Sequence, residues 1–139
     1  MNTKVLLAAL AGAVATFLSG WLLYGIALRG FFESNTLEAA RGLMRTEPIF
    51  WAIFIGCLAW SALLAFVFSK WAGISTFMTG AKAGAWIALL IALGMDFFNY
   101  ASMDAWTMTA TLVDPIVNAV QGAIAGGVVG WVLGYGNRT

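Results

Sequence analysis

The sequence predicts an all-α integral membrane protein, a bundle of four transmembrane helices that forms one domain over residues 1–139. Of the 139 residues, 62% are hydrophobic and 9% are charged, whereas a soluble domain carries about 25% charged residues. The mean hydropathy of +0.90 therefore indicates that the bilayer is the solvent. Four separate apolar stretches each approach the roughly 20 residues that a helix needs to cross a membrane.

The first two apolar stretches are bounded by basic residues and a proline. Residues 5–28 lie between Lys4 and Arg29, and residues 49–69 follow Pro48, which suits the first turn of a helix. A cleaved signal peptide is the alternative for the first stretch, because Lys4 precedes it. Signal peptides have apolar cores of about 7–15 residues, however, so this longer stretch predicts a retained membrane helix.

The third predicted span covers residues 74–98, and the fourth covers residues 115–134. Asp114 and Pro115 indicate where the fourth helix begins. Aspartate is a favoured N-cap residue, and proline is favoured at the first helical position. We therefore expect the fourth helix to begin directly at Pro115.

The segment between the first two spans, residues 29–48, is expected to hold a short helix on the membrane surface. Asn35 and Glu38 have the spacing of a capping box. Apolar residues then fall on one face and charged residues on another, as in an interfacial helix. An ordinary polar loop is the alternative.

Four spans place the N- and C-termini on the same side of the membrane. Basic residues on that side outnumber those on the other by four to three: Lys4, Lys70, Lys82 and Arg138 against Arg29, Arg41 and Arg45. The connection between the third and fourth spans has no basic residue and contains Asp104. Because basic residues concentrate on the cytoplasmic side, we predict that both termini are cytoplasmic.

Small residues recur at every fourth position of the spans, most regularly in the last two. Helices in lipid associate through close van der Waals contact, which a stripe of small residues permits. The spacing predicts tight helix packing within one chain or between chains, in a homo-oligomer or a larger membrane complex. The glycines of the last two stripes are Gly80, Gly84, Gly122, Gly126, Gly130 and Gly134.

Two short stretches of the chain resemble a known family. They are Ala15-Thr-Phe-Leu-Ser-Gly-Trp-Leu-Leu-Tyr-Gly25 and Gly122-Ala-Ile-Ala-Gly126, the second in a helix that an acidic residue leads into. They look like a family of small bacterial membrane proteins catalogued as domain of unknown function 1761, over most of the chain. The resemblance implies four helices in a bacterial inner membrane, and it carries no activity or site to transfer.

The composition excludes most familiar site chemistries. There is no histidine and Cys57 is the only cysteine, so the commonest general base, the usual haem and zinc ligand and an internal disulfide are missing. The net charge is +1, and no basic run marks a nucleic-acid surface. We therefore predict a protein that is not an enzyme and has no cofactor, metal site or nucleic-acid partner.

Asp96 is the strongest candidate for a functional residue. It lies on the small-residue face of the third span, and an ionisable group inside a bilayer costs roughly 2.5–3.5 kcal/mol. Each of these polar residues also has a purely structural interpretation. Asp96 could reach water at the membrane interface, Asp114 could cap the start of the fourth helix, and Asn118 could bond to a neighbouring helix. As the functional alternative, we expect one polar or ion site in which Arg29 is the counter-ion of the acidic residues. Its members are Arg29, Asp96, Asn99, Asp114 and Asn118.

Two functions are consistent with these patterns. The leading one is a small non-enzymatic membrane protein, an accessory subunit, scaffold or oligomer-forming protein, because the small-residue stripes are pervasive and reactive groups are few. The alternative is a small homo-oligomeric transporter or channel for a small solute or cation, which uses Asp96 and Asp114. The depth of Asp96 separates them, since a carboxylate that is buried beside a cavity favours transport.

Overall fold

The structure is a computed structural model that describes residues 2–136. It is all-helical, and four of its helices are long and apolar enough to cross a membrane, which indicates a multi-pass membrane protein. These four spans are Thr3–Ala27, Phe50–Ala72, Phe77–Ser102 and Met108–Gly134. Arg138, which the orientation prediction counts, lies outside the described residues.

Two of the four spans change helix type before they end. The first consists of α1 (Thr3–Gly20) and the π-helical η1 (Trp21–Ala27), and the second consists of α4 (Phe50–Val67) and the π-helical η2 (Phe68–Ala72). The third and fourth are α5 (Phe77–Ser102) and α6 (Met108–Gly134). Two short helices, α2 (Arg29–Ser34) and α3 (Glu38–Arg41), lie between the first two spans.

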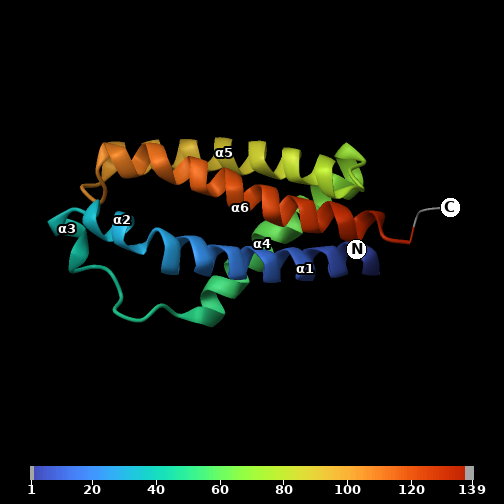
Figure 1. Ribbon diagram of the computed structural model, residues 1–139, viewed down its shortest axis with the longest axis horizontal. Helices are drawn as coiled ribbons and strands as arrows, with labels where there is room; N and C mark the ends of the chain where they lie inside the picture. The colour runs from blue at the N-terminus through green and yellow to red at the C-terminus, as the bar shows by residue number, and fades with distance from the viewer. Residues whose placement is uncertain (1, 137–139) are drawn as a thin grey trace.

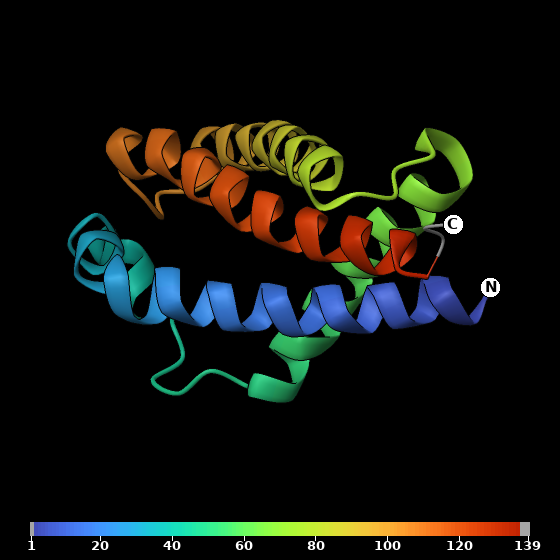
Figure 2. The ribbon, with the colours of Figure 1, turned by 45° about the vertical axis from the view of Figure 1, so that its right-hand side comes forward.

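The spans form a bundle in which α6 occupies the centre. Figure 1 shows α5 and α6 side by side, with α1 along the other side of α6. Helix α4 packs against α1 and crosses the other helices obliquely (Figures 1 and 2). The start of α1 and the end of α6 lie at one end of the bundle, whereas α2, α3 and the turn between α5 and α6 lie at the other. We call these the terminal end and the loop end.

Helices α5 and α6 approach each other through glycine. A methyl group added to Gly84 would lie 2.9 Å from the Cα atom of Gly126 and would also press on the carbonyl oxygen of Gly122. A methyl group on Gly130 would lie 3.2 Å from the Cα atom of Gly80. Gly134 meets the backbone of Ser75, just before α5. Backbone thus faces backbone, at a separation that no larger residue allows.

The apolar core lies toward the terminal end, where α1, α4 and α6 meet. A methyl group on Gly12 would lie 2.6 Å from Val129 Cγ2 and 3.0 Å from Ser61 Cβ, so all three helices converge there. The buried residues of the core are Val5, Ala8, Ala9, Leu64, Ala65, Phe68, Ala125, Val129 and Leu133. In α4 the buried residues all fall in its second half, and its first half diverges from the bundle.

The segment between the first two spans differs from the capping-box prediction, which was wrong. Asn35 caps the C-terminus of α2 instead, and its Nδ2 donates to the carbonyl oxygen of Phe31 at 2.9 Å. Its Oδ1 accepts a hydrogen bond from Thr107 Oγ1 at 2.6 Å, which joins this segment to the turn before α6. Because the asparagine is used in this way, the four-residue α3 begins after Leu37 without a side-chain cap.

The fourth helix begins well before the predicted start at Pro115. Its N-cap is Thr107, whose Oγ1 accepts a hydrogen bond from the backbone N–H of Ala110 at 3.3 Å. Pro115 is fully buried in the interior of α6. Asp114 is therefore an interior helical residue and not an N-cap, so its position needs a different explanation. The other span ends differ from the predicted ones by a few residues.

The contact between α5 and α6 gives the first prediction. Gly84→Leu should lower the free energy of unfolding by about 1–3 kcal/mol, because its new side chain meets backbone atoms that cannot move aside. Gly94→Leu is the matched control on the same helix, since a Cβ atom there meets nothing within 4 Å. Reversible unfolding in mixed micelles, followed by circular dichroism, measures both. Equal losses in the two variants would contradict this contact.

Candidate functional site

Three polar side chains meet between the first span and α6, toward the loop end. The Tyr24 hydroxyl donates to Asp114 Oδ1 at 2.6 Å. Asn118 Nδ2 lies 2.8 Å from Asp114 Oδ2 and 2.9 Å from the Tyr24 hydroxyl oxygen, and it can donate to either. Both oxygens of the Asp114 carboxylate thus have a hydrogen-bond donor from inside the bundle.

Helix geometry explains why these three residues meet. Asp114 and Asn118 are four positions apart on α6, so they lie on the same face. Tyr24 lies in η1, where Leu28 N–H donates to the carbonyl oxygen of Leu23 at 2.8 Å, a bond across five residues. Such π-helical turns often occur at functional sites, because they shift the direction of the side chains they carry.

A second polar contact joins the first span to α6 one turn deeper. Gln121 Nε2 donates to the carbonyl oxygen of Thr16 at 2.9 Å. The Thr16 hydroxyl lies 3.3 Å from that of Ser61, so α4 belongs to the same contact. Gly20 gives the glutamine its space, since a methyl group there would lie 2.8 Å from Nε2. The amides of Asn118 and Gln121 thus both bond to the first span.

Asp96 faces the same cluster from α5. Its side chain lines the same two cavities as that of Asp114. Its Oδ2 atom is buried and has no hydrogen-bond partner among the described residues. Two carboxylates at short range repel each other, and a positive charge between them relieves that repulsion. A cation or a proton bound between Asp96 and Asp114 would therefore be stabilised electrostatically.

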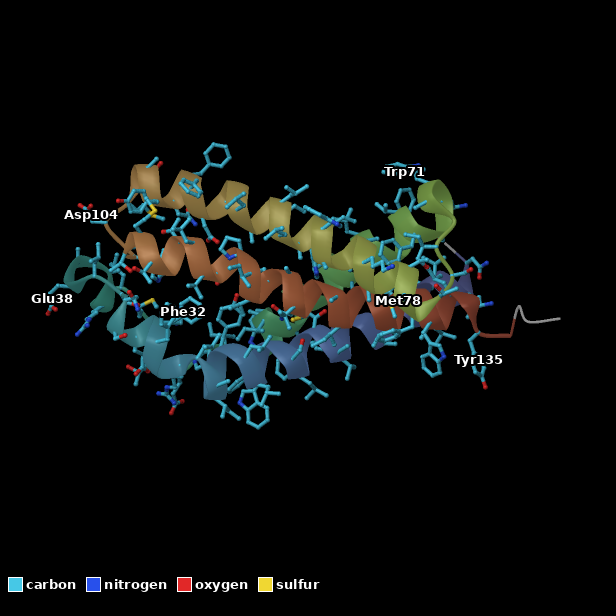
Figure 3. The ribbon with its side chains drawn as sticks, turned by 45° about the horizontal axis from the view of Figure 1, so that its top comes forward. Phe32, Glu38, Trp71, Met78, Asp104 and Tyr135 are labelled. Carbon is cyan, nitrogen blue, oxygen red and sulfur yellow. The ribbon has the colours of Figure 1, made fainter. Side chains whose placement is uncertain are left out.

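The carboxylate pair lies between two cavities. The first, of about 260 Å³, is lined by Tyr24, Phe32, Met44, Asp96, Trp106, Ala110, Thr111 and Asp114. We call it the aromatic cavity; Figure 3 shows Phe32 on the side of α2 that faces α6. The second, of about 420 Å³, has walls from all four spans, including Thr16, Cys57, Ala92 and Gln121. We call it the lateral cavity. Asp96 and Asp114 belong to both.

The structure brings together Asp96, Asp114 and Asn118, but it places two other predicted residues elsewhere. Arg29 is exposed on α2, where its Nε donates to Glu33 Oε1 at 2.9 Å. That hydrogen bond and the charge of Glu33 raise the pKa of Arg29 above its ordinary value. Asn99 lies near the end of α5, and neither it nor Arg29 lines the two cavities. The expected counter-ion is thus paired with another residue.

Tyr24 and Trp106 line the aromatic cavity but are not among the predicted site residues. The sequence feature that could have indicated a contact between the first span and the site is Tyr24 itself, because it is the only tyrosine of the first span. Among the described residues, no group of three or more histidine, cysteine, aspartate or glutamate side chains is placed to hold a metal ion. Chemically, two carboxylates beside aromatic rings can hold a positive charge.

The bond from Tyr24 gives the second prediction. Tyr24→Phe should lower the free energy of unfolding by about 1–2 kcal/mol, because it removes the donor to Asp114 and keeps the ring. Tyr135→Phe is the control, since that side chain is exposed at the end of α6. Unfolding in mixed micelles again measures both. If Tyr24→Phe proves as stable as the control, the hydrogen bond does not hold the first span to α6.

Comparison with known proteins leaves the chain without an assigned family. No protein-family model matches it, and no match is found among curated proteins or solved structures. The resemblance to domain of unknown function 1761 stays a prediction. Function must then be argued from the site, because a helical bundle by itself does not imply one.

Proposed function

We propose that this protein is a non-enzymatic membrane carrier that binds a small cation or cationic solute at Asp96, inside the bilayer. One observation carries the proposal: Asp96 Oδ2 is buried, has no hydrogen-bond partner among the described residues, and lies beside Asp114 between two cavities. Of the two functions that the sequence predicts, this is the transport alternative.

The energetic cost of Asp96 supports a functional role. A carboxylate within a membrane span costs roughly 2.5–3.5 kcal/mol on insertion scales. For Asp114 the hydrogen bonds from Tyr24 and Asn118 offset that cost. Asp96 has no such pair of donors, and its place in the second half of α5 opposes the helix dipole. A ligand with positive charge would supply the missing interaction.

The two cavities support carriage over a fixed structural role. The ligand of a carrier must be able to reach the binding site from two directions. Asp96 borders one cavity at the loop end and another between the spans. The hydrogen bonds of Tyr24 and Asn118 hold Asp114 in place at the boundary. A rearrangement at this boundary would expose Asp96 to one cavity at a time.

The second candidate is an accessory or oligomer-forming subunit, which the uncovered faces of α4 and α5 favour. Only 22% of the most apolar stretch of the α4 span and 17% of that of α5 are buried within the chain. Lipid covers such faces in any membrane protein, so this observation has less weight than Asp96. A homo-oligomer formed through α4 and α5 is compatible with the carrier. The bacterial inner membrane stays the predicted location.

Transport through Asp96 gives the third prediction. In proteoliposomes, Asp96→Asn should abolish cation- or proton-coupled flux that the wild-type protein supports, because the amide keeps the shape but loses the charge. Asp104→Asn is the matched control, since Asp104 is exposed in the turn between α5 and α6 (Figure 3). Flux that is equal in both variants would remove Asp96 from the mechanism. No wild-type flux across a broad panel of cations and solutes would count against a carrier.

A further inference from the structure

We propose that the ligand of this site is a hydrophobic organic cation, an inference that rests on the proposed function. Its chemical class is an ammonium group that carries an aromatic or branched alkyl body. It reaches Asp96 from the bilayer, through the lateral cavity between α4 and α5.

The walls of the aromatic cavity suit an alkylammonium group. Three aromatic side chains, Tyr24, Phe32 and Trp106, line it together with the two carboxylates. The rings of Tyr24 and Phe32 lie close together, with centroids 5.2 Å apart. The faces of aromatic rings attract cations, most strongly when the site is desolvated, and clusters of such rings recognise quaternary ammonium groups. Aromatic rings beside carboxylates therefore favour a cation with an apolar surface.

The shortage of oxygen atoms argues against a bare metal ion. Hard cations such as calcium and magnesium take about six or more oxygen ligands. Here both oxygens of Asp114 already accept hydrogen bonds from Tyr24 and Asn118. Asp96 is the remaining acid, and no group of three acidic or other metal-binding side chains is found within residues 2–136. An organic cation needs few ligands, because its charge is weakly hydrated.

The lateral cavity provides a path from the lipid. Its floor is polar, with Thr16, Asn118 and Gln121, while apolar side chains of α4 and α5 form its rim. Ile53 on α4 and Ile91 on α5 are exposed at that rim, where the first half of α4 diverges from the bundle. An amphiphilic cation dissolved in the bilayer would enter with its apolar body between the two helices and its charge toward Asp96.

The combined size of the cavities fits a small ligand of this kind. The aromatic cavity, of about 260 Å³, is slightly smaller than the roughly 300–1,000 Å³ of small-molecule sites, and the lateral cavity, of about 420 Å³, lies within that range. Both are lined mainly by apolar side chains with a few polar groups, as is usual for such sites. Asp96 and Asp114, which border both cavities, would place the positive charge at their junction.

Equilibrium binding of radiolabelled benzyltrimethylammonium to the full chain in lipid nanodiscs tests the inference. The competitor is neopentylbenzene, which has the same shape with a carbon atom in place of the charged nitrogen. We expect the wild-type protein to bind the cation, the neutral compound to compete at least about tenfold less well, and Asp96→Asn to weaken binding at least about tenfold. Equal competition by the neutral compound would overturn the inference.

The aromatic contribution has its own variant and control. Trp106→Leu should weaken binding about three- to thirtyfold, the range for loss of a desolvated cation–π contact. Trp131→Leu, an exposed tryptophan on α6 at the terminal end, should leave affinity unchanged. An affinity of Trp106→Leu equal to that of the control would overturn the aromatic assignment.

A measurement without any substitution tests the path. Cys57, the only cysteine, lines the lateral cavity. Bound benzyltrimethylammonium should slow its alkylation by N-ethylmaleimide several-fold in the wild-type protein, and an unchanged rate at saturating ligand would overturn entry through this cavity. If the protein binds no organic cation but carries sodium, potassium or protons in an Asp96-dependent way, this inference fails and the proposed function stands. If neither binding nor flux depends on Asp96, both fail.

Discussion

In a bilayer, helices gain no hydrophobic free energy from meeting each other, so they must be held by close contact and by polar bonds. Helix α6 meets this constraint on two faces. Toward α5 it presents Gly122 and Gly126, whose backbone atoms touch those of the partner helix. Toward the first span it presents Asn118 and Gln121, whose amides bond to Tyr24 and to the backbone of α1. The arrangement of the bundle follows from this division.

The same division places the candidate site. Because α6 is bonded to the first span on one side and pressed against α5 on the other, Asp114 lies where it can meet both Tyr24 and Asp96. Helix α4 contributes only its second half to the core, and its first half leaves the lateral cavity open beside the carboxylates. Tight packing at the terminal end and open space toward the loop end thus have a common structural origin.

The spans were predictable because hydropathy and length determine them. The glycines at intervals of four lie where α5 and α6 approach closely, which the spacing alone could not assign to this pair of helices. The start of α6 was not predictable, because Asp114 and Pro115 have the sequence pattern of a helix N-terminus. The helix in fact begins earlier, where the Thr107 hydroxyl is the N-cap. Tyr24 was missed because an aromatic residue near a span end usually marks the interface. Arg29 was misplaced because Glu33, four residues later, binds it locally. The spacing of Arg29 and Glu33 was visible in the sequence, whereas the tertiary bond from Tyr24 to Asp114 was not.

The candidate site depends most directly on Asp96 facing Asp114. In a Cys57→Ser chain in native membranes, Asp96→Cys combined with Asp114→Cys should cross-link readily on oxidation. Cyanogen bromide cleavage after Met103 and Met108 would then leave the two fragments joined. Phe98→Cys combined with Asp114→Cys is the control, because Phe98 is 72% exposed on the same stretch of α5, and it should not cross-link. Failure of the 96–114 pair, or equal cross-linking of both pairs, would contradict the account.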